Sequence, residues 1–257
     1  MKLKLFAGIV SAAVLLTAGS AWAGEVTADV NTDVSILTDY VWRGQNYGEG
    51  GVIQPNLSIG FGYGLSLGVW ANYNIDDDRY ASSHQVNEVD YTIDYSRDLG
   101  PIGISLGAIY YDFPRTGGAD TQEWYVGATV NILLSPSVTV YRDFHEIDGT
   151  YITLGIGHDI ELNDKATLSL GGTLAYANEA YNKGYFSVSD PTIDVEDDSL
   201  SDYNISISLA YALTDKVTVT PTISYSGFTD DDIKDAAELV YDEDSNIYGG
   251  INFSYSF

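Results

Sequence analysis

Hydrophobic and polar residues alternate along most of the chain in segments of about ten residues. In residues 217–225, for example, Val217, Val219, Ile223 and Tyr225 alternate with threonine and serine. Such alternation places the two sets on opposite faces of a β-strand, and about ten residues is the length of a tilted strand that crosses a bilayer. The pattern predicts twelve strands, at residues 33–43, 52–63, 65–76, 86–97, 101–113, 121–133, 137–146, 149–160, 166–178, 202–212, 217–228 and 246–257.

The connections between these strands alternate between tight and mostly longer ones. The tight connections are rich in Gly, Pro, Asn, Asp and Ser, which favour turns. An even number of antiparallel strands with short turns at one end and longer loops at the other is typical of outer-membrane barrels. We therefore predict an all-β fold, a transmembrane antiparallel up-and-down β-barrel with short periplasmic turns and longer outer loops. The predicted outer connections lie near 44–51, 77–85, 114–120, 147–148, 179–201 and 229–245, and the fourth of them is short and fits the pattern less well.

The last strand carries a second signal. Phe253, Tyr255 and Phe257 alternate with Asn252, Ser254 and Ser256, and the sequence ends on the aromatic residue. This pattern resembles the C-terminal signal of bacterial outer-membrane barrels, which implies recognition by the barrel-assembly machinery. We expect this strand to close the barrel against the first strand, with its polar residues facing the lumen beside Asp39 and Arg43.

The N-terminal segment has the features of a secretory signal peptide. Lys2 and Lys4 precede an apolar run, and Ala21–Ala23 form a small-x-small cleavage site. The apolar run is shorter than the roughly 20 residues of a membrane-spanning helix. We expect residues 1–23 to be the signal peptide and residues 24–257 to be one outer-membrane barrel domain in a Gram-negative bacterium.

The amino-acid composition limits the kinds of molecule that the protein can bind. The net charge of −26 argues against nucleic acid, and the absence of cysteine excludes disulfides and thiolate metal sites. The 21 tyrosines suit a girdle at the membrane–water interface, so outer-membrane lipid and lipopolysaccharide are expected partners. A secreted soluble β protein is the alternative, and the signal peptide, the turns and the terminal Phe257 together argue against it.

Alternation also assigns residues to the lumen. In the first predicted strand it places Asp39 and Arg43 in the lumen, and Tyr40 and Trp42 toward lipid. Arg43 then either selects solutes at a constriction or forms an internal ion pair that fixes the barrel register. The excess of lumen carboxylates predicts cation preference if the lumen is open. The candidate pore-lining residues are Asp39, Arg43, Trp70, Asp90, Asp94, Glu123 and Asp143.

Residues 38–45 (TDYVWRGQ), followed by Gln54-Pro55 and the segment Gly68-Val69-Trp70, resemble the TorF-type family of proteobacterial outer-membrane porins. That family carries a Ser-Asp-Tyr-aromatic-Arg-Gly motif in its first strand. Here Thr38 replaces the serine, and Val41 separates the tyrosine from the tryptophan. The resemblance implies a barrel in the outer membrane more firmly than it implies a substrate.

Catalytic and metal sites have weaker support. His145 and Asp143 form the one histidine–acid pair at the expected outer rim, and no second acid pair is evident, so we predict that the protein is not an enzyme. Acidic clusters at 76–78, 194–198, 230–232 and 242–244 lack EF-hand spacing. A solvated outer surface is the favoured interpretation of these clusters, and divalent bridging to lipopolysaccharide is the alternative. We predict no cofactor and no metal.

The sequence therefore favours an outer-membrane porin for passive diffusion of small hydrophilic solutes. The alternative is a structural or adhesive barrel whose lumen is plugged by side chains such as Trp70 and Arg43 and whose acidic outer loops bind cations.

Overall fold

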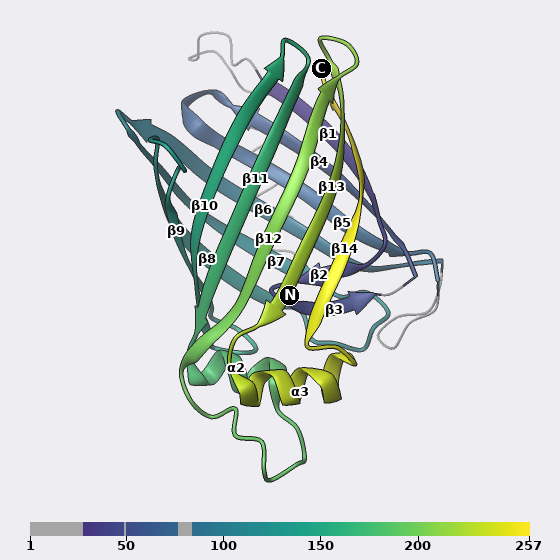
Figure 1. Ribbon diagram of the computed structural model, residues 1–257, viewed down its shortest axis with the longest axis vertical. Helices are drawn as coiled ribbons and strands as arrows, with labels where there is room; N and C mark the ends of the chain where they lie inside the picture. The colour runs from purple at the N-terminus through teal and green to yellow at the C-terminus, as the bar shows by residue number, and fades with distance from the viewer. Residues whose placement is uncertain (1–27, 49, 77–83) are drawn as a thin grey trace, which may run out of the picture.

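The computed structural model describes residues 28–48, 50–76 and 84–257. The predicted signal peptide and part of the 76–78 acidic cluster lie outside them. Twelve strands of the described residues form one closed antiparallel barrel, as predicted (Figure 1). They are β1 (Ala28–Leu37), β4 (Val52–Phe61), β5 (Leu65–Asn74), β6 (Gln85–Leu99), β7 (Ile102–Asp112), β8 (Thr121–Val130), β9 (Ser137–Asp143), β10 (Thr150–Asn163), β11 (Ala166–Ala177), β12 (Ser199–Ala212), β13 (Val217–Phe228) and β14 (Ser245–Ser256).

The last strand closes the barrel against the first. β14 pairs antiparallel with β1, with Val34 opposite Phe253 and Ser35 opposite Asn252. Asn252 donates hydrogen bonds from Nδ2 to Asp33 Oδ2 at 2.8 Å and to Ser35 Oγ at 2.9 Å. The predicted closure and the predicted lumen face of the terminal strand are both confirmed.

The two ends of the barrel differ (Figure 1). The tight connections and the C-terminus lie at one end, here called the turn end, and the connections that carry helices lie at the other, here called the loop end. Residues 62–64 at the turn end form a single 3₁₀ turn, η1 (Gly62–Gly64). In outer-membrane barrels the short turns face the periplasm, so the loop end faces outward.

The outer surface of the wall is apolar. Ile205 is 59% exposed and Trp124 is 41% exposed. A continuous apolar surface of this size would drive aggregation in water and is expected against lipid. Further exposed apolar side chains are Leu57, Val69, Leu106, Val126, Leu154, Ile156, Leu170, Ile207, Ile223, Ile251 and Phe253.

The first predicted strand is wrong in position, whereas the other eleven agree with the structure to within three residues at each end. β1 ends at Leu37, and the chain then leaves the wall and forms a separate two-stranded hairpin, β2 (Tyr40–Trp42) and β3 (Gln45–Gly48). The prediction that Tyr40 and Trp42 face lipid is therefore also wrong. Alternation runs through both elements, so periodicity alone did not reveal the break at Thr38.

Two helices occupy connections that were predicted as loops. α2 (Glu179–Phe186) follows β11, and α3 (Asp231–Tyr241) follows β13, and both lie at the loop end (Figure 1). Asn178 caps α2 by accepting a hydrogen bond from Tyr181 N, and Asp230 caps α3 by accepting from Asp232 N and Ile233 N. Among the described residues, no helix is long and apolar enough to cross a membrane.

Candidate functional site

The hairpin β2–β3 is folded into the barrel and is called the plug here (residues 40–48). Its tip is a two-residue turn at Arg43 and Gly44, which have φ values of 49° and 79°. Positive φ at both central positions is the geometry of a type I′ hairpin turn. Gly44 is also required for space, because a Cβ there would lie 2.7 Å from the Phe228 ring and 3.0 Å from Asp202 Cβ. The tip therefore packs against β12 and β13.

Arg43 forms the central ion pair of the lumen. Its guanidinium donates two hydrogen bonds to Glu123 of β8, at 2.9 Å to Oε1 and 2.8 Å to Oε2. Tyr111 of β7 donates a third hydrogen bond to Glu123 Oε2 at 2.9 Å. The Arg43 and Glu123 side chains are 8% and 2% exposed, so this bidentate pair lies away from solvent. Of the two interpretations of Arg43, the geometry supports the internal ion pair.

Four aromatic rings surround the same guanidinium. The Arg43 Cζ atom lies 4.3 Å from the Trp42 ring centroid, 4.6 Å from Tyr141, 4.3 Å from Tyr151 and 5.7 Å from Tyr181. Rings at these distances attract a cation and replace part of the solvation that it loses on burial. Arg43 thus joins the plug to β9, β10 and α2, as well as to β8.

The other side of the plug is held by amide side chains. Gln45 is fully buried, donates to Tyr181 Oη at 3.2 Å, and accepts from Tyr47 at 2.7 Å and Tyr241 at 2.6 Å. Asn46 donates to Asn246 Oδ1 of β14 at 3.0 Å. The plug therefore contacts side chains from β8, β9, β10, β12, β13 and β14 and from helix α2.

The helices close the loop end above the plug. Their buried faces pack with the ends of β10, β11 and β13 into one apolar cluster. Within it the Phe186 and Phe228 rings meet edge to face at 5.2 Å, and Phe186 meets Tyr241 at 5.8 Å. The cluster comprises Tyr151, Ala175, Ala177, Tyr181, Phe186, Val195, Phe228, Ile233, Ala236, Ala237 and Tyr241. Many tyrosines therefore fill the lumen, and the predicted role of tyrosine in an interfacial girdle is incomplete.

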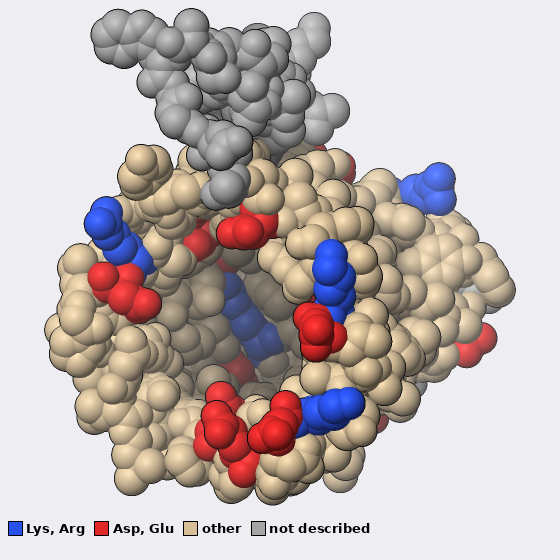
Figure 2. Space-filling model, turned by 90° about the horizontal axis from the view of Figure 1, so that it is seen from above, with Lys and Arg blue, Asp and Glu red and all other residues tan. Residues whose placement is uncertain are grey.

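The turn-end half of the barrel is hollow. Figure 2 looks into this end and shows an open depression. Acidic and basic side chains lie on its rim, and part of a Lys or Arg residue (blue) is visible deep inside. A cavity of about 450 Å³ here is lined largely by small residues, including Ser105, Gly127, Thr129 and Thr139. Small side chains leave space that the aromatic residues fill in the other half. In the described structure, side chains thus fill much of the loop-end half of the lumen, and the turn-end half is hollow.

The structure brings four of the predicted pore-lining residues to the plug. Besides Arg43 and Glu123, these are Trp70 and Asp90, which lie opposite each other on β5 and β6. The Trp70 ring contacts Tyr40 of the plug at 5.5 Å, so Trp70 fills the lumen. The other three are dispersed: Asp39 precedes β2, Asp94 accepts a hydrogen bond from Tyr125 at 2.5 Å farther along the wall, and Asp143 lies at the loop end of β9. The predicted position of Arg43 beside the terminal strand is wrong, because Arg43 lies on the plug and pairs with Glu123 of β8.

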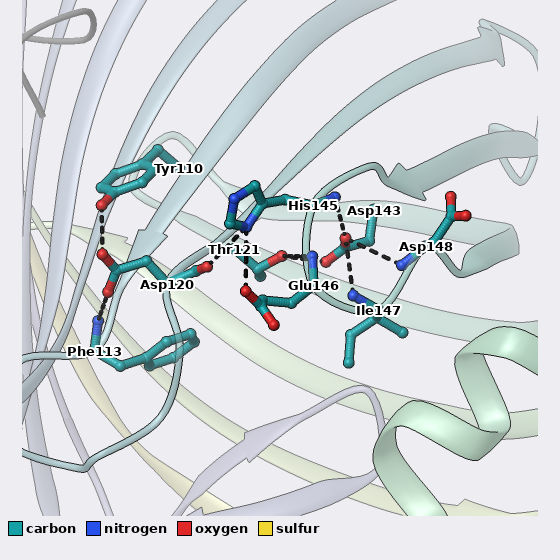
Figure 3. Close-up of polar contacts among 9 residues, drawn as sticks. All are labelled: Tyr110, Phe113, Asp120, Thr121, Asp143, His145, Glu146, Ile147 and Asp148. Atoms are coloured by element: carbon teal, nitrogen blue, oxygen red, sulfur yellow. Dashed lines mark hydrogen bonds and ion pairs between the residues drawn. The ribbon is translucent and has the colours of Figure 1, made fainter. Parts of the chain in front are cut away.

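Asp143 and His145 do not form a catalytic pair through their side chains (Figure 3). The Asp143 carboxylate accepts from the backbone N–H groups of His145, Ile147 and Asp148 at 2.8–3.3 Å and from Thr121 Oγ1 at 2.5 Å. Its role is therefore to organise the 144–149 connection. The His145 ring instead lies with Nδ1 3.2 Å from the Asp120 carbonyl oxygen.

Two Gly-x-Ser-x-Gly sequences, the pattern of a hydrolase nucleophile elbow, occur at 64–68 and 103–107. Their serines lie within β5 and β7, not at a strand-to-helix turn, so neither forms a nucleophile elbow.

The acidic residues of the loop-end connections largely serve local structure. Asp230 caps α3, and Asp231 pairs with Lys234 at 2.9 Å. Asp198 accepts from Glu179 N at 2.8 Å and from Tyr176 Oη at 2.9 Å, and these two hydrogen bonds lower the pKa of its carboxyl group. The described residues contain no group of three or more His, Asp or Glu side chains arranged to hold a metal ion.

Comparison with known proteins extends the fold assignment. The KdgM porin in complex with disordered oligogalacturonate is 14% identical, with a TM-score of 0.52 over 90% of this chain and 99% of that one. The NanC porin is 13% identical, with a TM-score of 0.51 over 90% and 100%. LpxR from Salmonella typhimurium is 8% identical, with a TM-score of 0.52 over 88% and 100%. At identities this low, the similarity shows a shared barrel fold and does not transfer the activity of these proteins to this chain.

Sequence comparison identifies the family. No curated protein matches the chain. The family model of MltA-interacting protein MipA matches residues 24–257, and the TorF-type resemblance is not confirmed. Together with the barrel fold, this match assigns the protein to the outer membrane. The chain belongs to the MltA-interacting protein MipA family.

Proposed function

We propose that this protein is a plugged structural barrel of the outer membrane that serves as a platform for a periplasmic partner. One observation carries the proposal: the plug, held by the buried Arg43–Glu123 pair, and the helical cluster fill the loop-end half of the lumen. An open diffusion pore needs a continuous aqueous path, and side chains lining it would be wet. Here Gln45, at the centre of the plug, is fully buried.

The name of the family supports the choice of partner, because the family is called after interaction with MltA. The hollow half opens at the turn end, which faces the periplasm by the rule for outer-membrane barrels (Figure 2). A closed barrel with a preformed periplasmic rim keeps the membrane sealed while it presents a rigid surface.

We expect the purified barrel in detergent to bind purified MltA with a saturable dissociation constant, measured by biolayer interferometry. The NanC porin, which has the same fold, is the matched control and should not bind. Equal signals from both barrels, or no signal from this protein, would contradict the platform function. Neither result bears on whether the lumen is closed, which conductance measurements test separately.

A second candidate function is a gated, cation-preferring channel for small hydrophilic solutes. It is favoured by one observation: the plug forms its own two-stranded sheet and shares no β-ladder with the wall. In the described part of the chain its contacts with the wall run through side chains, so a change in these contacts would release it as a unit. Carboxylates such as Asp90 and Glu123 would then face the path of the solute.

Export and assembly form a further part of the proposal. Residues 1–23 would direct export and be removed, and the terminal aromatic residues would be read by the barrel-assembly machinery before the band of apolar side chains meets lipid and lipopolysaccharide. Phe257 is 71% exposed and its ring contacts Tyr255 at 4.7 Å. The side chain is thus presented outward on the closing strand.

We expect Phe257→Ala to reduce the yield of folded barrel in the outer membrane several-fold, because it removes the terminal aromatic residue and leaves the rest of the wall intact. Heat-modifiable migration on gels measures the folded fraction. Phe144→Ala, which removes an exposed phenylalanine at the loop end, is the control and should assemble normally. Equal yields from both variants would refute the role of the terminal residue.

The proposed function is not enzymatic. The support is the commitment of Asp143 to backbone amides and the position of the two Gly-x-Ser-x-Gly serines inside strands.

A further inference from the structure

A second cavity lies at the loop end, beside the plug and next to α2. It has a volume of about 360 Å³ and is enclosed by the plug, the ends of β6 and β7, the connection 113–120 and α2. Gly118 and Ala119 in its wall are exposed, so the cavity reaches the outer surface. Its aromatic lining residues are Tyr40, Trp42, Tyr47, Tyr111, Phe113 and Tyr185.

One charged side chain lines this cavity within the described part of the chain. Glu88 of β6 is buried, and the Tyr40 hydroxyl hydrogen-bonds to its carboxyl group. Asp90 follows two residues later on the same face of β6, and its buried Oδ1 atom has no hydrogen-bond partner in the described residues. Two neighbouring carboxyl groups therefore lie beneath the aromatic lining.

The nearest buried base does not neutralise these carboxyl groups. The guanidinium of Arg43 is occupied by both oxygens of Glu123. The 113–120 connection supplies several lining residues, but its Arg115 is exposed and does not line the cavity. The cavity is thus an aromatic chamber with the Glu88 carboxyl group at its wall and with no protein cation among its described lining residues.

Aromatic faces and a carboxylate together select a cation that carries apolar groups. The quadrupole of each ring attracts the positive charge, and the carboxylate sets its position. The protein already uses this chemistry once, because Trp42 contacts the Arg43 guanidinium at 4.3 Å and also lines the cavity. Binding of a cation would stabilise the ionised form of Glu88, and a neutral ligand would gain nothing from it.

We propose that this cavity, between the plug and the 113–120 connection, is a binding site for a small organic ammonium ion. The site goes beyond the proposed platform function and does not depend on it. Binding from the outer side requires only that the plug occupies the position described here, since Tyr40, Trp42 and Tyr47 form one wall.

The test compares two probes of nearly the same shape. Choline carries a trimethylammonium group, and 3,3-dimethylbutan-1-ol replaces its nitrogen with carbon. We expect isothermal titration of the detergent-solubilised full barrel to show one choline site, with at least about tenfold weaker binding of the neutral analogue. Equal affinity for the two, absence of choline binding, or binding of a neutral sugar such as arabinose in place of choline would overturn the proposal.

Variants locate the site. Glu88→Gln keeps the shape and the hydrogen-bonding capacity of the side chain, and we expect it to weaken choline binding about tenfold. Phe113→Ala removes one ring from a connection outside the wall, so it tests the site even if the Glu88 variant does not fold. Trp124→Phe changes an outward-facing aromatic residue and should leave affinity unchanged. Loss of binding in the Trp124 variant alone, or full affinity in both cavity variants, would place the site elsewhere.

Discussion

Replacing Arg43 with alanine is expected to lower the free energy of unfolding by about 3–5 kcal/mol, because the substitution leaves the Glu123 carboxylate buried without its cation. Glu123 is 2% exposed, and Tyr111 would be its one remaining side-chain donor among the described contacts. The aromatic rings that surround the guanidinium would also lose their contacts with it. Urea unfolding in phospholipid vesicles, followed by tryptophan fluorescence, measures the change.

Two further variants separate the ion pair from general damage. Arg43→Lys keeps the charge but loses the planar two-bond geometry, so we expect a loss of about 1–2 kcal/mol. Arg43→Met combined with Glu123→Gln removes both charges and should recover most of the stability lost in the alanine variant. If Arg43→Ala costs less than about 1 kcal/mol, the pair does not hold the plug.

Removal of the plug is expected to convert the barrel into a conducting pore. In this variant a short Gly-Ser linker replaces residues 40–48 and joins β1 to the connection before β4. The barrel ladder should persist, because the plug shares no β-ladder with the wall. The cavity at the loop end and the hollow at the turn end would then connect along β5 to β8, since the plug forms a wall of the first.

The resulting pore should prefer cations. Glu88, Asp90 and Glu123 would face the lumen, and the basic side chain that pairs with Glu123 would be absent. Reversal potentials across a salt gradient measure this preference. The linker variant with Glu88→Gln and Glu123→Gln is the matched control, and its preference should fall. A plug-less barrel that folds but stays silent would mean that the helical cluster alone closes the lumen.

Much of the wall could be predicted from the sequence. Strand length, period-two alternation and turn residues are local properties, and they located β13 at its observed bounds, 217–228. The outward face of the terminal strand followed from the same alternation. Asp90, Trp70 and Glu123 were placed in the lumen for this reason; in the structure Trp70 lies opposite Asp90, and Glu123 is buried.

The plug could not be predicted from alternation, because a hairpin in the lumen and a strand in the wall have the same period. The signal that could have revealed it is Arg43-Gly44, a two-residue turn with positive φ at both positions. A strand that continues through such a turn is improbable on steric grounds.

The two helices were not predicted from the sequence, because their segments are rich in acidic residues and were therefore interpreted as solvated loops. In α3 the buried residues Ile233, Ala236, Ala237 and Tyr241 recur at helical spacing after Asp230, a typical N-cap. The pairing of Arg43 with Glu123, 80 residues apart, depends on how far the plug enters the barrel. No local pattern contains that information.

Single-channel recording of the wild-type protein in planar bilayers tests the central claim most directly. With the plug and the helical cluster in place, we predict that folded barrels insert without discrete conductance steps, while the plug-less variant recorded under the same conditions conducts. Stable ohmic steps from the wild-type barrel would contradict the account and establish an open channel.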